Sequence, residues 1–177
     1  MLFRSKYGYH TQQSTAQLQD LYRKSRGEGF GPQPKMRILM GMYVSAAQYS
    51  EQYYQQALKA RTLIRQDFDL AFDRAGKHRL DALLTPTTPT TAFPMENVYG
   101  DSVMMQYADQ LTVPANHAGN PGISFPGGLD ADGMPIGLQL LGPDFSEGTL
   151  LQMTHAYEGA TADAEWRRIR PAVLREL

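Results

Sequence analysis

Apolar residues in the first part of the chain recur every three or four positions, which is the spacing of one face of an α-helix. This pattern predicts three helices, over residues 14–26, 34–43 and 45–75. Ser14 or Thr15 suits the capping position of the first helix, and Pro34 suits the first turn of the second. The longest helix carries a stripe rich in tyrosine, which we interpret as a core-facing surface rather than a ligand surface.

Short apolar runs separated by proline, glycine and threonine replace this pattern in the second part of the chain. They predict a buried strand over 80–85, further strands over 123–125 and 136–141, and helices over 104–111 and 149–158. The segment Asp130–Gly133 is typical of a hairpin turn. Strands separated by helices indicate an α/β fold with a mixed β-sheet flanked by helices. We interpret the basic segment 166–170, which contains the one tryptophan, as a surface tail.

Composition and charge exclude several classes of protein. The chain has 17 Lys and Arg residues against 18 Asp and Glu, which argues against a free-standing basic nucleic-acid-binding protein. Because the sequence has no cysteine, disulfide scaffolds, zinc–thiolate sites and cysteine nucleophiles are excluded. No apolar run approaches the roughly 20 residues of a membrane span, and the first residues do not form a secretory signal. We therefore expect a soluble intracellular protein.

No complete catalytic motif is found among the residues themselves. The sequence lacks the Gly-x-Ser-x-Gly pattern of a nucleophile elbow and a phosphate-binding loop ending in Gly-Lys-Ser/Thr. Its four histidines do not have the spacing of metal ligands. His117 or His155 could act as a catalytic base, but a structural or surface role is favoured for both.

Two charged residues and two segments are candidates for a binding site. Arg37 lies in an apolar helical stretch, where its planar guanidinium could bind a carboxylate; a structural ion pair is the alternative. Asp109, near the end of the predicted helix 104–111, opposes the helix dipole and could bind an ammonium group, or it is an ordinary surface residue. The loop 85–91, with five threonines and two prolines, is either part of a site or a rigid connection. The glycine-rich segment 119–128 permits close approach of a ligand or of another element.

Several of these segments, taken in order, resemble consecutive blocks of the amidase-signature enzymes. The blocks are Tyr7-Gly-Tyr-His10, Ser25-Arg-Gly-Glu-Gly-Phe-Gly31, Arg37-Ile-Leu-Met-Gly-Met-Tyr43, Ala60-Arg-Thr-Leu-Ile-Arg-Gln-Asp-Phe68, Leu84-Thr-Pro-Thr87, Val113-Pro-Ala-Asn-His-Ala-Gly-Asn-Pro-Gly122 and Pro135-Ile-Gly-Leu-Gln-Leu-Leu-Gly142. Within this family, the pattern is most similar to the C-terminal part of the A subunit of glutamyl-tRNA(Gln)/aspartyl-tRNA(Asn) amidotransferases. The resemblance extends from about Tyr7 to Glu158, which is nearly the whole chain.

The resemblance implies a fold and a chemistry. The fold is the C-terminal portion of a mixed β-sheet flanked by helices, so residues 1–177 would form a partial amidase-signature domain. Family members hydrolyse a carboxamide through an acyl-serine intermediate, with a second serine and a lysine activating the nucleophile. In the amidotransferase the carboxamide is that of glutamine. The released ammonia converts Glu-tRNA(Gln) to Gln-tRNA(Gln), and in some systems Asp-tRNA(Asn) to Asn-tRNA(Asn).

The resemblance also implies partner subunits, of the B type and the small C type, with tRNA engaged only indirectly through the complex. No cofactor is expected on this chain, because ATP and Mg belong to the partner in the family. The expected location is the cytoplasm, or a mitochondrion or plastid in a eukaryote.

The serine–serine–lysine set of the family has no counterpart in this sequence. There is no Gly-Gly-Ser-Ser-Gly-type stretch, and the lysines do not match the context of the catalytic lysine. We therefore expect no amide hydrolysis by this chain alone.

Two substrate contacts of the family do match residues of this chain. Arg37 occupies the position of the arginine that binds the α-carboxylate of glutamine, and Asp109 that of the aspartate that binds its α-ammonium group. Two alternatives remain: a part of another amidase-signature hydrolase, or a non-catalytic module that binds a partner or an amino acid.

Overall fold

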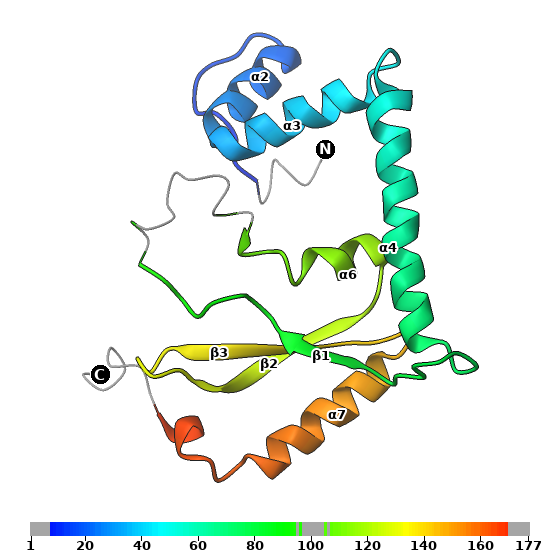
Figure 1. Ribbon diagram of the computed structural model, residues 1–177. Helices are drawn as coiled ribbons and strands as arrows, with labels where there is room; N and C mark the ends of the chain where they lie inside the picture. The colour runs from blue at the N-terminus through cyan, green and yellow to red at the C-terminus, as the bar shows by residue number, and fades with distance from the viewer. Residues whose placement is uncertain (1–7, 95, 97–104, 106, 170–177) are drawn as a thin grey trace. The chain divides into compact units, whose positions relative to one another are not determined.

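The computed structural model of the chain describes residues 8–94, 96, 105 and 107–169 (Figure 1). The chain divides into two compact units, Met1–Leu58 and Lys59–Leu177. Helices form the first unit, and a β-sheet with helices forms the second. No helix in the described residues is long and apolar enough to cross a membrane.

The first unit contains the helices α2 (Leu18–Gly29) and α3 (Pro32–Ser45), followed by a π-helical turn, Ser50–Gln55. The two predicted helices are confirmed, but α2 begins four residues later than Ser14 because Ser14 and Thr15 make no capping hydrogen bond and Gln17 has an extended backbone. A proline does occupy the first turn of α3, as expected, although the helix begins at Pro32 rather than Pro34.

Two of the sequence blocks contact each other in the first unit. The Glu28 carboxylate accepts hydrogen bonds from Tyr9 Oη at 2.8 Å, Thr11 Oγ1 at 2.9 Å and Gln13 Nε2 at 2.9 Å. Gly29 leaves room for the Tyr9 ring, since a Cβ atom there would lie 2.8 Å from Tyr9 Cδ1. The segment before α2 is therefore fixed along the end of that helix.

The predicted helix 45–75 is divided in the structure. Ser45 belongs to α3 and residues 46–49 form a bend and a turn, after which the π-helical turn continues directly into the α-helix α4 (Gln56–Phe72). In the first unit, the rings of Tyr43 and Tyr49 stack at 4.4 Å, and Tyr53 lies near both. The tyrosine stripe therefore begins as an aromatic cluster that remains partly exposed, and it becomes buried only at Phe72, so the core-facing interpretation holds for that end alone.

The second unit is built on a three-stranded sheet in the order β1 (Leu83–Pro86), β3 (Pro135–Leu141), β2 (Gly122–Leu129). The three predicted strands are confirmed, but β1 is half-exposed rather than buried because it lies at an edge. In the described residues both strand pairs are antiparallel, whereas a mixed sheet was expected. The reason is local: a short hairpin joins β2 to β3, and β1 pairs with the other edge of β3.

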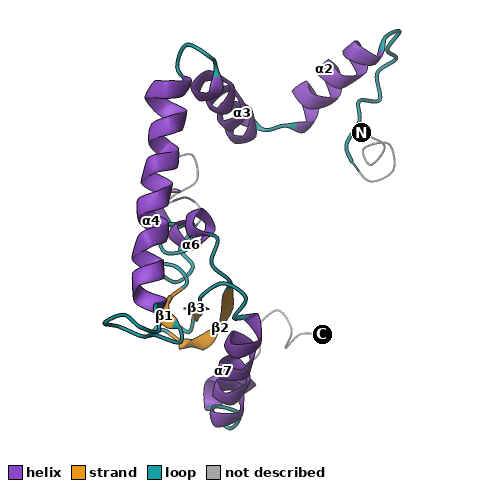
Figure 2. Ribbon diagram, turned by 90° about the vertical axis from the view of Figure 1, so that its right-hand side faces the viewer, coloured by secondary structure: helices purple, strands orange, loops and turns teal. Residues whose placement is uncertain are grey.

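Strand register gives the sheet two different faces. Leu138 and Leu140 of β3 lie on one face with Phe125 and Ile123 of β2, and this face packs against Leu150 of α7 (Glu147–Ala160). On the other face, Gln139 pairs with Thr85 of β1 and Ser124 of β2 in one polar row. Figure 2 shows α7 on one side of the strands and α6 (Val113–Ala118) on the other, which confirms the expected sheet flanked by helices.

The predicted hairpin turn at Asp130–Gly133 is confirmed. The Asp130 carboxylate accepts hydrogen bonds from the backbone N–H groups of Asp132 and Met134, at 2.9 and 2.8 Å, and from the Thr91 hydroxyl at 2.6 Å. These bonds, above all the one from Thr91, lower the pKa of the Asp130 carboxyl group. One carboxylate thus closes the turn and ties the end of the threonine-rich loop to it.

The segment after α7 is more buried than the expected surface tail. It forms a 3-10 helix, Glu165–Arg168, in which Trp166 and Arg167 are half-buried. The Arg167 guanidinium lies over the Trp166 ring at 4.6 Å, and its Nε donates a hydrogen bond to Thr161 Oγ1. The hydrogen bond to Thr161, with the Arg167 guanidinium over the Tyr157 ring at 5.9 Å, holds this segment against the end of α7. Residues 170–177 lie outside the described part.

Substitution Leu150→Ala should destabilise the chain by about 2–5 kcal/mol, because Leu150 has 2% of its surface exposed and fills the core under the sheet. Leu151→Ala on the same helix is the matched control, because 59% of Leu151 is exposed. Urea unfolding of both variants measures the difference. Equal free energies of unfolding would contradict the assignment of the core.

The hairpin carboxylate predicts a pH dependence of stability. Since the folded-state pKa of Asp130 is lowered, its hydrogen bonds add stability that is fully present above the usual Asp pKa of about 4 and is lost as the pH falls through the lower folded-state pKa. Asp130→Asn should therefore lower the urea midpoint at pH 7 and lower it less at pH 3. In Asp132→Asn, the control, the side chain is exposed and both midpoints should stay near those of the original chain. An effect of Asp130→Asn that is equal at both pH values would refute the assignment.

Candidate functional site

Arg37 lies in the first turns of α3, and its side chain is exposed. Among the described residues, it makes no hydrogen bond or ion pair, so the structural ion pair that was the alternative is not formed there. Pro32 and Pro34 lie in the first turn of α3, where backbone N–H groups would have no partner within the helix. Proline lacks this N–H group, and its ring holds the first turn in a helical conformation. Arg37 follows in the second turn of α3, and its guanidinium donors are available to a ligand.

Asp109 lies in the second unit, in a turn that leads into α6. Its carbonyl oxygen accepts hydrogen bonds from the N–H groups of Thr112 and Val113, both at 3.0 Å. Its carboxylate is exposed and, within the described part of the chain, has no hydrogen bond or ion-pair partner. Of the predicted helix 104–111, residues 105 and 107 are helical, 104 and 106 lie outside the described residues, and residues 108–112 form a turn, so Asp109 lies in a turn rather than within the helix.

The two candidate residues belong to different units. Arg37 is part of the first unit and Asp109 of the second. Their meeting around one ligand therefore stays a prediction that rests on the family resemblance and on the complementary charges of the two groups.

Two arginines of α4 hold the C-terminal end of the helix that follows Asp109. Arg61 Nε donates a hydrogen bond to the His117 carbonyl oxygen at 2.7 Å, and Arg65 donates one to the Ala118 carbonyl oxygen at 2.8 Å. These carbonyls lie at the C-terminal end of α6, where cations are favourable. The sequence assigned no separate role to Arg61 and Arg65, although their spacing of four residues places them on one helix face.

Arg65 also joins α4 to the loop before α7. Its guanidinium forms an ion pair with Asp144 at 2.7 Å and another with Asp69 at 2.9 Å. The hydrogen bond from Arg65 lowers the pKa of Asp144, and the same bond raises the pKa of Arg65. The Arg65 guanidinium therefore connects α4, the C-terminal end of α6 and the loop before α7.

Gln139 is a third residue that the sequence analysis did not single out. It lies in the central strand with 5% of its surface exposed, and its side-chain amide donates hydrogen bonds to Thr85 and to the carbonyl oxygen of Leu111. The feature of the sequence that could have identified Gln139 is its amide side chain, which stands among the apolar residues of 136–141.

The hydroxyl groups of the threonine-rich loop bond to the protein itself. Thr87 shares a hydrogen bond with Ser124 at 2.9 Å, Thr88 donates to the Thr90 carbonyl, and Thr91 donates to Asp130. Between the two interpretations of the loop, these bonds favour a rigid connection over a site.

Glycines of segment 119–128 serve close packing within the sheet. A Cβ atom at Gly127 would lie 2.5 Å from Leu138 Cγ, and one at Gly122 would lie 2.9 Å from Leu141 Cδ2. Gly119 ends α6 with a φ of 83°, a left-handed conformation that favours glycine. Of the two alternatives for this segment, the glycines therefore permit the close approach of another element of the fold rather than of a ligand.

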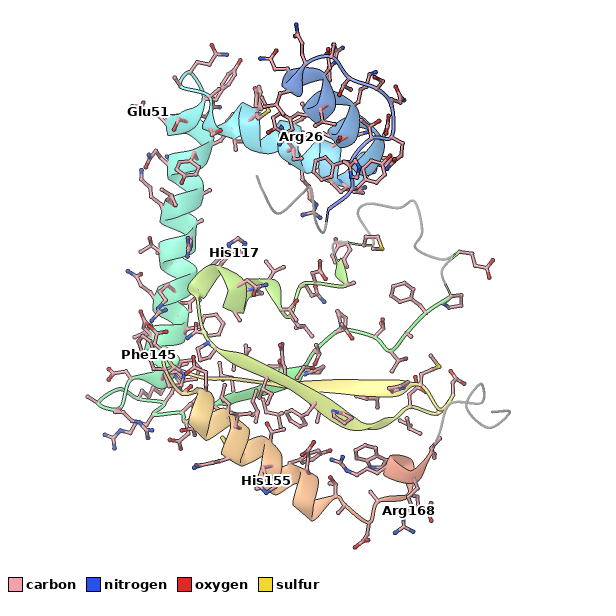
Figure 3. The ribbon with its side chains drawn as sticks, turned by 180° about the vertical axis from the view of Figure 1, so that it is seen from behind. Arg26, Glu51, His117, Phe145, His155 and Arg168 are labelled. Carbon is pink, nitrogen blue, oxygen red and sulfur yellow. The ribbon has the colours of Figure 1, made fainter. Side chains whose placement is uncertain are left out.

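The two histidines named as possible bases are far from forming one centre. His117 lies on α6 and His155 on α7, on opposite sides of the sheet (Figure 3). Both are exposed, which agrees with the favoured surface role. In the residues that the structure describes, no three His, Asp or Glu side chains form a group that could hold a metal ion.

Known proteins with similar sequences share one description. The A subunit of the glutamyl-tRNA(Gln) amidotransferase of Desulforamulus reducens is 45% identical over 168 residues, which are 95% of this chain and 33% of that protein. The corresponding A subunit of a Synechococcus species is 49% identical over 155 residues, covering 88% of this chain and 31% of that protein. The chain thus spans about a third of the length of these relatives, and it corresponds to a C-terminal part of them.

Solved structures give the same result. The A subunit of the glutamyl-tRNA(Gln) amidotransferase of Thermotoga maritima matches with a TM-score of 0.52 and 33% identity, over 75% of this chain and 28% of that one. A crystal structure described as an amidase matches with a TM-score of 0.58 and 26% identity, over 76% of this chain and 30% of that one. Residues 2–151 also match the general sequence model of the amidase family. On these grounds, the chain belongs to the amidase family.

Proposed function

We propose that this chain is the C-terminal part of the A subunit of a tRNA-dependent amidotransferase, and that it supplies the groups that bind the amino-acid end of glutamine. The observation that carries the proposal is the identity of 43–49% to relatives named as the A subunit of glutamyl-tRNA(Gln) amidotransferase, over most of this chain. The exposed charged groups of Arg37 and Asp109, which lack partners in the described residues, support it.

The chemistry of the two groups suits glutamine. Its α-carboxylate and α-ammonium groups are held on one carbon atom, so a binding site needs a cation and an anion close together. A guanidinium offers two parallel N–H donors to a carboxylate, and a carboxylate accepts from an ammonium group. Together they select a zwitterionic amino acid over a simple amide, because each unpaired charge of the site would remain unsatisfied with a neutral ligand.

Cleavage of the amide requires groups that this sequence does not contain. The proposed division is that the serine–serine–lysine set comes from the preceding part of the A subunit, while this chain orients the substrate. The ammonia then passes to a B-type subunit, which binds ATP and Mg, and a small C-type subunit completes the complex. We place this complex in the cytoplasm or in an organelle, with tRNA bound through the partner.

A second candidate is a part of another amidase-signature hydrolase that acts on a simple amide. The match to a structure described only as an amidase favours it. A complete enzyme with this chain would then cleave benzamide or acetamide at least as well as glutamine, whereas the amidotransferase proposal predicts a strong preference for glutamine. If the chain is instead a non-catalytic module, calorimetry of the chain with glutamine should detect binding without turnover.

In a complete A subunit that carries this chain, Arg37→Ala or Asp109→Ala should raise the KM for glutamine about ten- to a hundredfold, because each removes a charge-assisted hydrogen bond. Steady-state glutaminase assays measure the change. Arg23→Ala and Asp20→Ala on α2 are matched controls, because both side chains are exposed and carry the same charges. Unchanged glutamine kinetics in both test variants would contradict the site assignment.

A further inference from the structure

The turn that carries Asp109 is connected to the sheet by one buried side chain. Gln139 Nε2 donates hydrogen bonds to the Leu111 carbonyl oxygen at 2.9 Å and to Thr85 Oγ1 at 2.9 Å, with a longer bond of 3.3 Å to the Pro86 carbonyl. Gln139 lies in the central strand, on the face opposite α7. A single amide group therefore joins β3 to β1 and to the segment that follows Asp109.

Leu111 is part of the same turn as Asp109. The Asp109 carbonyl oxygen accepts hydrogen bonds from the Thr112 and Val113 N–H groups and, at 3.1 Å, from the Thr112 hydroxyl. Leu111 therefore lies inside the turn that these bonds close, between Asp109 and Thr112. Holding the Leu111 carbonyl against the sheet thus fixes the direction in which the whole turn, with the Asp109 carboxylate, projects.

The other end of the segment is held independently. Arg61 and Arg65 bond the last carbonyls of α6, so the helix cannot shift along its axis without losing those bonds. Among the described residues, no arginine bonds the turn at Asp109. The buried side chain that restrains this turn is Gln139, through its bond to the Leu111 carbonyl oxygen.

An amide is the group that this place requires. Its three acceptors are oxygen atoms, and a side-chain NH2 supplies two protons to them. A thioether of similar length has no proton to donate, and a carboxylate would place negative charge against carbonyl oxygens. Loss of the amide leaves the Leu111 carbonyl without this partner and frees the turn to move.

We propose that Gln139 is a positioning residue for recognition of the α-ammonium group of the substrate, acting through Leu111 on Asp109. This inference rests on the proposed function, in which Asp109 binds that ammonium group. Gln139 acts by limiting the orientations of the carboxylate rather than by contacting the substrate. The same bond gives the polar face of the sheet a role in substrate selection.

A double-mutant cycle in the complete amidotransferase tests the proposal. Glutamine kcat/KM is measured for the original enzyme, Gln139→Met, Asp109→Ala and the double variant. Gln139→Met alone should lower kcat/KM about tenfold, mainly through KM, which corresponds to one lost hydrogen bond. In the Asp109→Ala background it should have little further effect, because the group that it positions is already absent.

A purely structural role would give a different result. The losses from Gln139→Met and Asp109→Ala would then multiply in the double variant, and the proposal would be overturned. If Asp109→Ala itself leaves glutamine kinetics unchanged, the proposed function fails instead, so the two failures are distinct. Thr85→Val is the matched control, because it removes another partner of the Gln139 amide and keeps the bond to Leu111.

A second variant is used if the Gln139→Met chain fails to fold or to assemble into the complete amidotransferase. Gln139→Asn keeps an amide but is shorter by one methylene, so it should lose the Leu111 bond while remaining polar. The same cycle with Gln139→Asn should again be non-additive with Asp109→Ala. Independent, multiplying effects would overturn the proposal here as well.

Discussion

The second unit depends on the register of its central strand. β3 pairs with both neighbours, and the pairs Thr85–Gln139 and Ser124–Gln139 set one polar row across the sheet. Residues on either side of Gln139 then point to the opposite face, where Leu138 and Leu140 join the core under α7. A shift of one residue would exchange the two faces, burying an amide in the apolar core and exposing leucines, so the register is strongly specified.

This register links packing to the candidate site. The apolar face fixes the sheet against α7, and the polar face then presents the Gln139 amide to the turn that carries Asp109. Arg61 and Arg65 bring α6 to α4 with charged hydrogen bonds at its C-terminal end. Asp109 is thereby supported from two directions, while its own carboxylate remains exposed. A binding group needs this combination, in which the backbone is rigid and the charge is available.

Much of this fold could be predicted from the sequence. Helical periodicity located α2, α3, α4 and α7, and short apolar runs with a hairpin signal located β2 and β3. The π-helical turn at Ser50–Gln55 could not be predicted because the tyrosine spacing is helical through it. The antiparallel pairing of these three strands could not be predicted for another reason: pairing is a long-range property, and alternation of strands and helices did not show that β1 would join β3.

The candidate site was predicted in part. Arg37 and Asp109 were identified through the family resemblance, and the structure finds both exposed. The residues that support Asp109 were missed, because contacts such as Gln139 to Leu111 join positions 28 residues apart. Periodicity shows which face a side chain occupies, but it does not show which distant carbonyl oxygen that side chain will meet.

The most direct test of this account is a crystal structure of the complete amidotransferase with glutamine bound. The account predicts that the Arg37 guanidinium lies about 2.7–2.9 Å from the α-carboxylate oxygens of glutamine, and that the Asp109 carboxylate lies at a similar distance from its α-ammonium nitrogen. Glutamine bound with either charged end held by other residues, and with Arg37 or Asp109 beyond about 4 Å of it, would contradict the account.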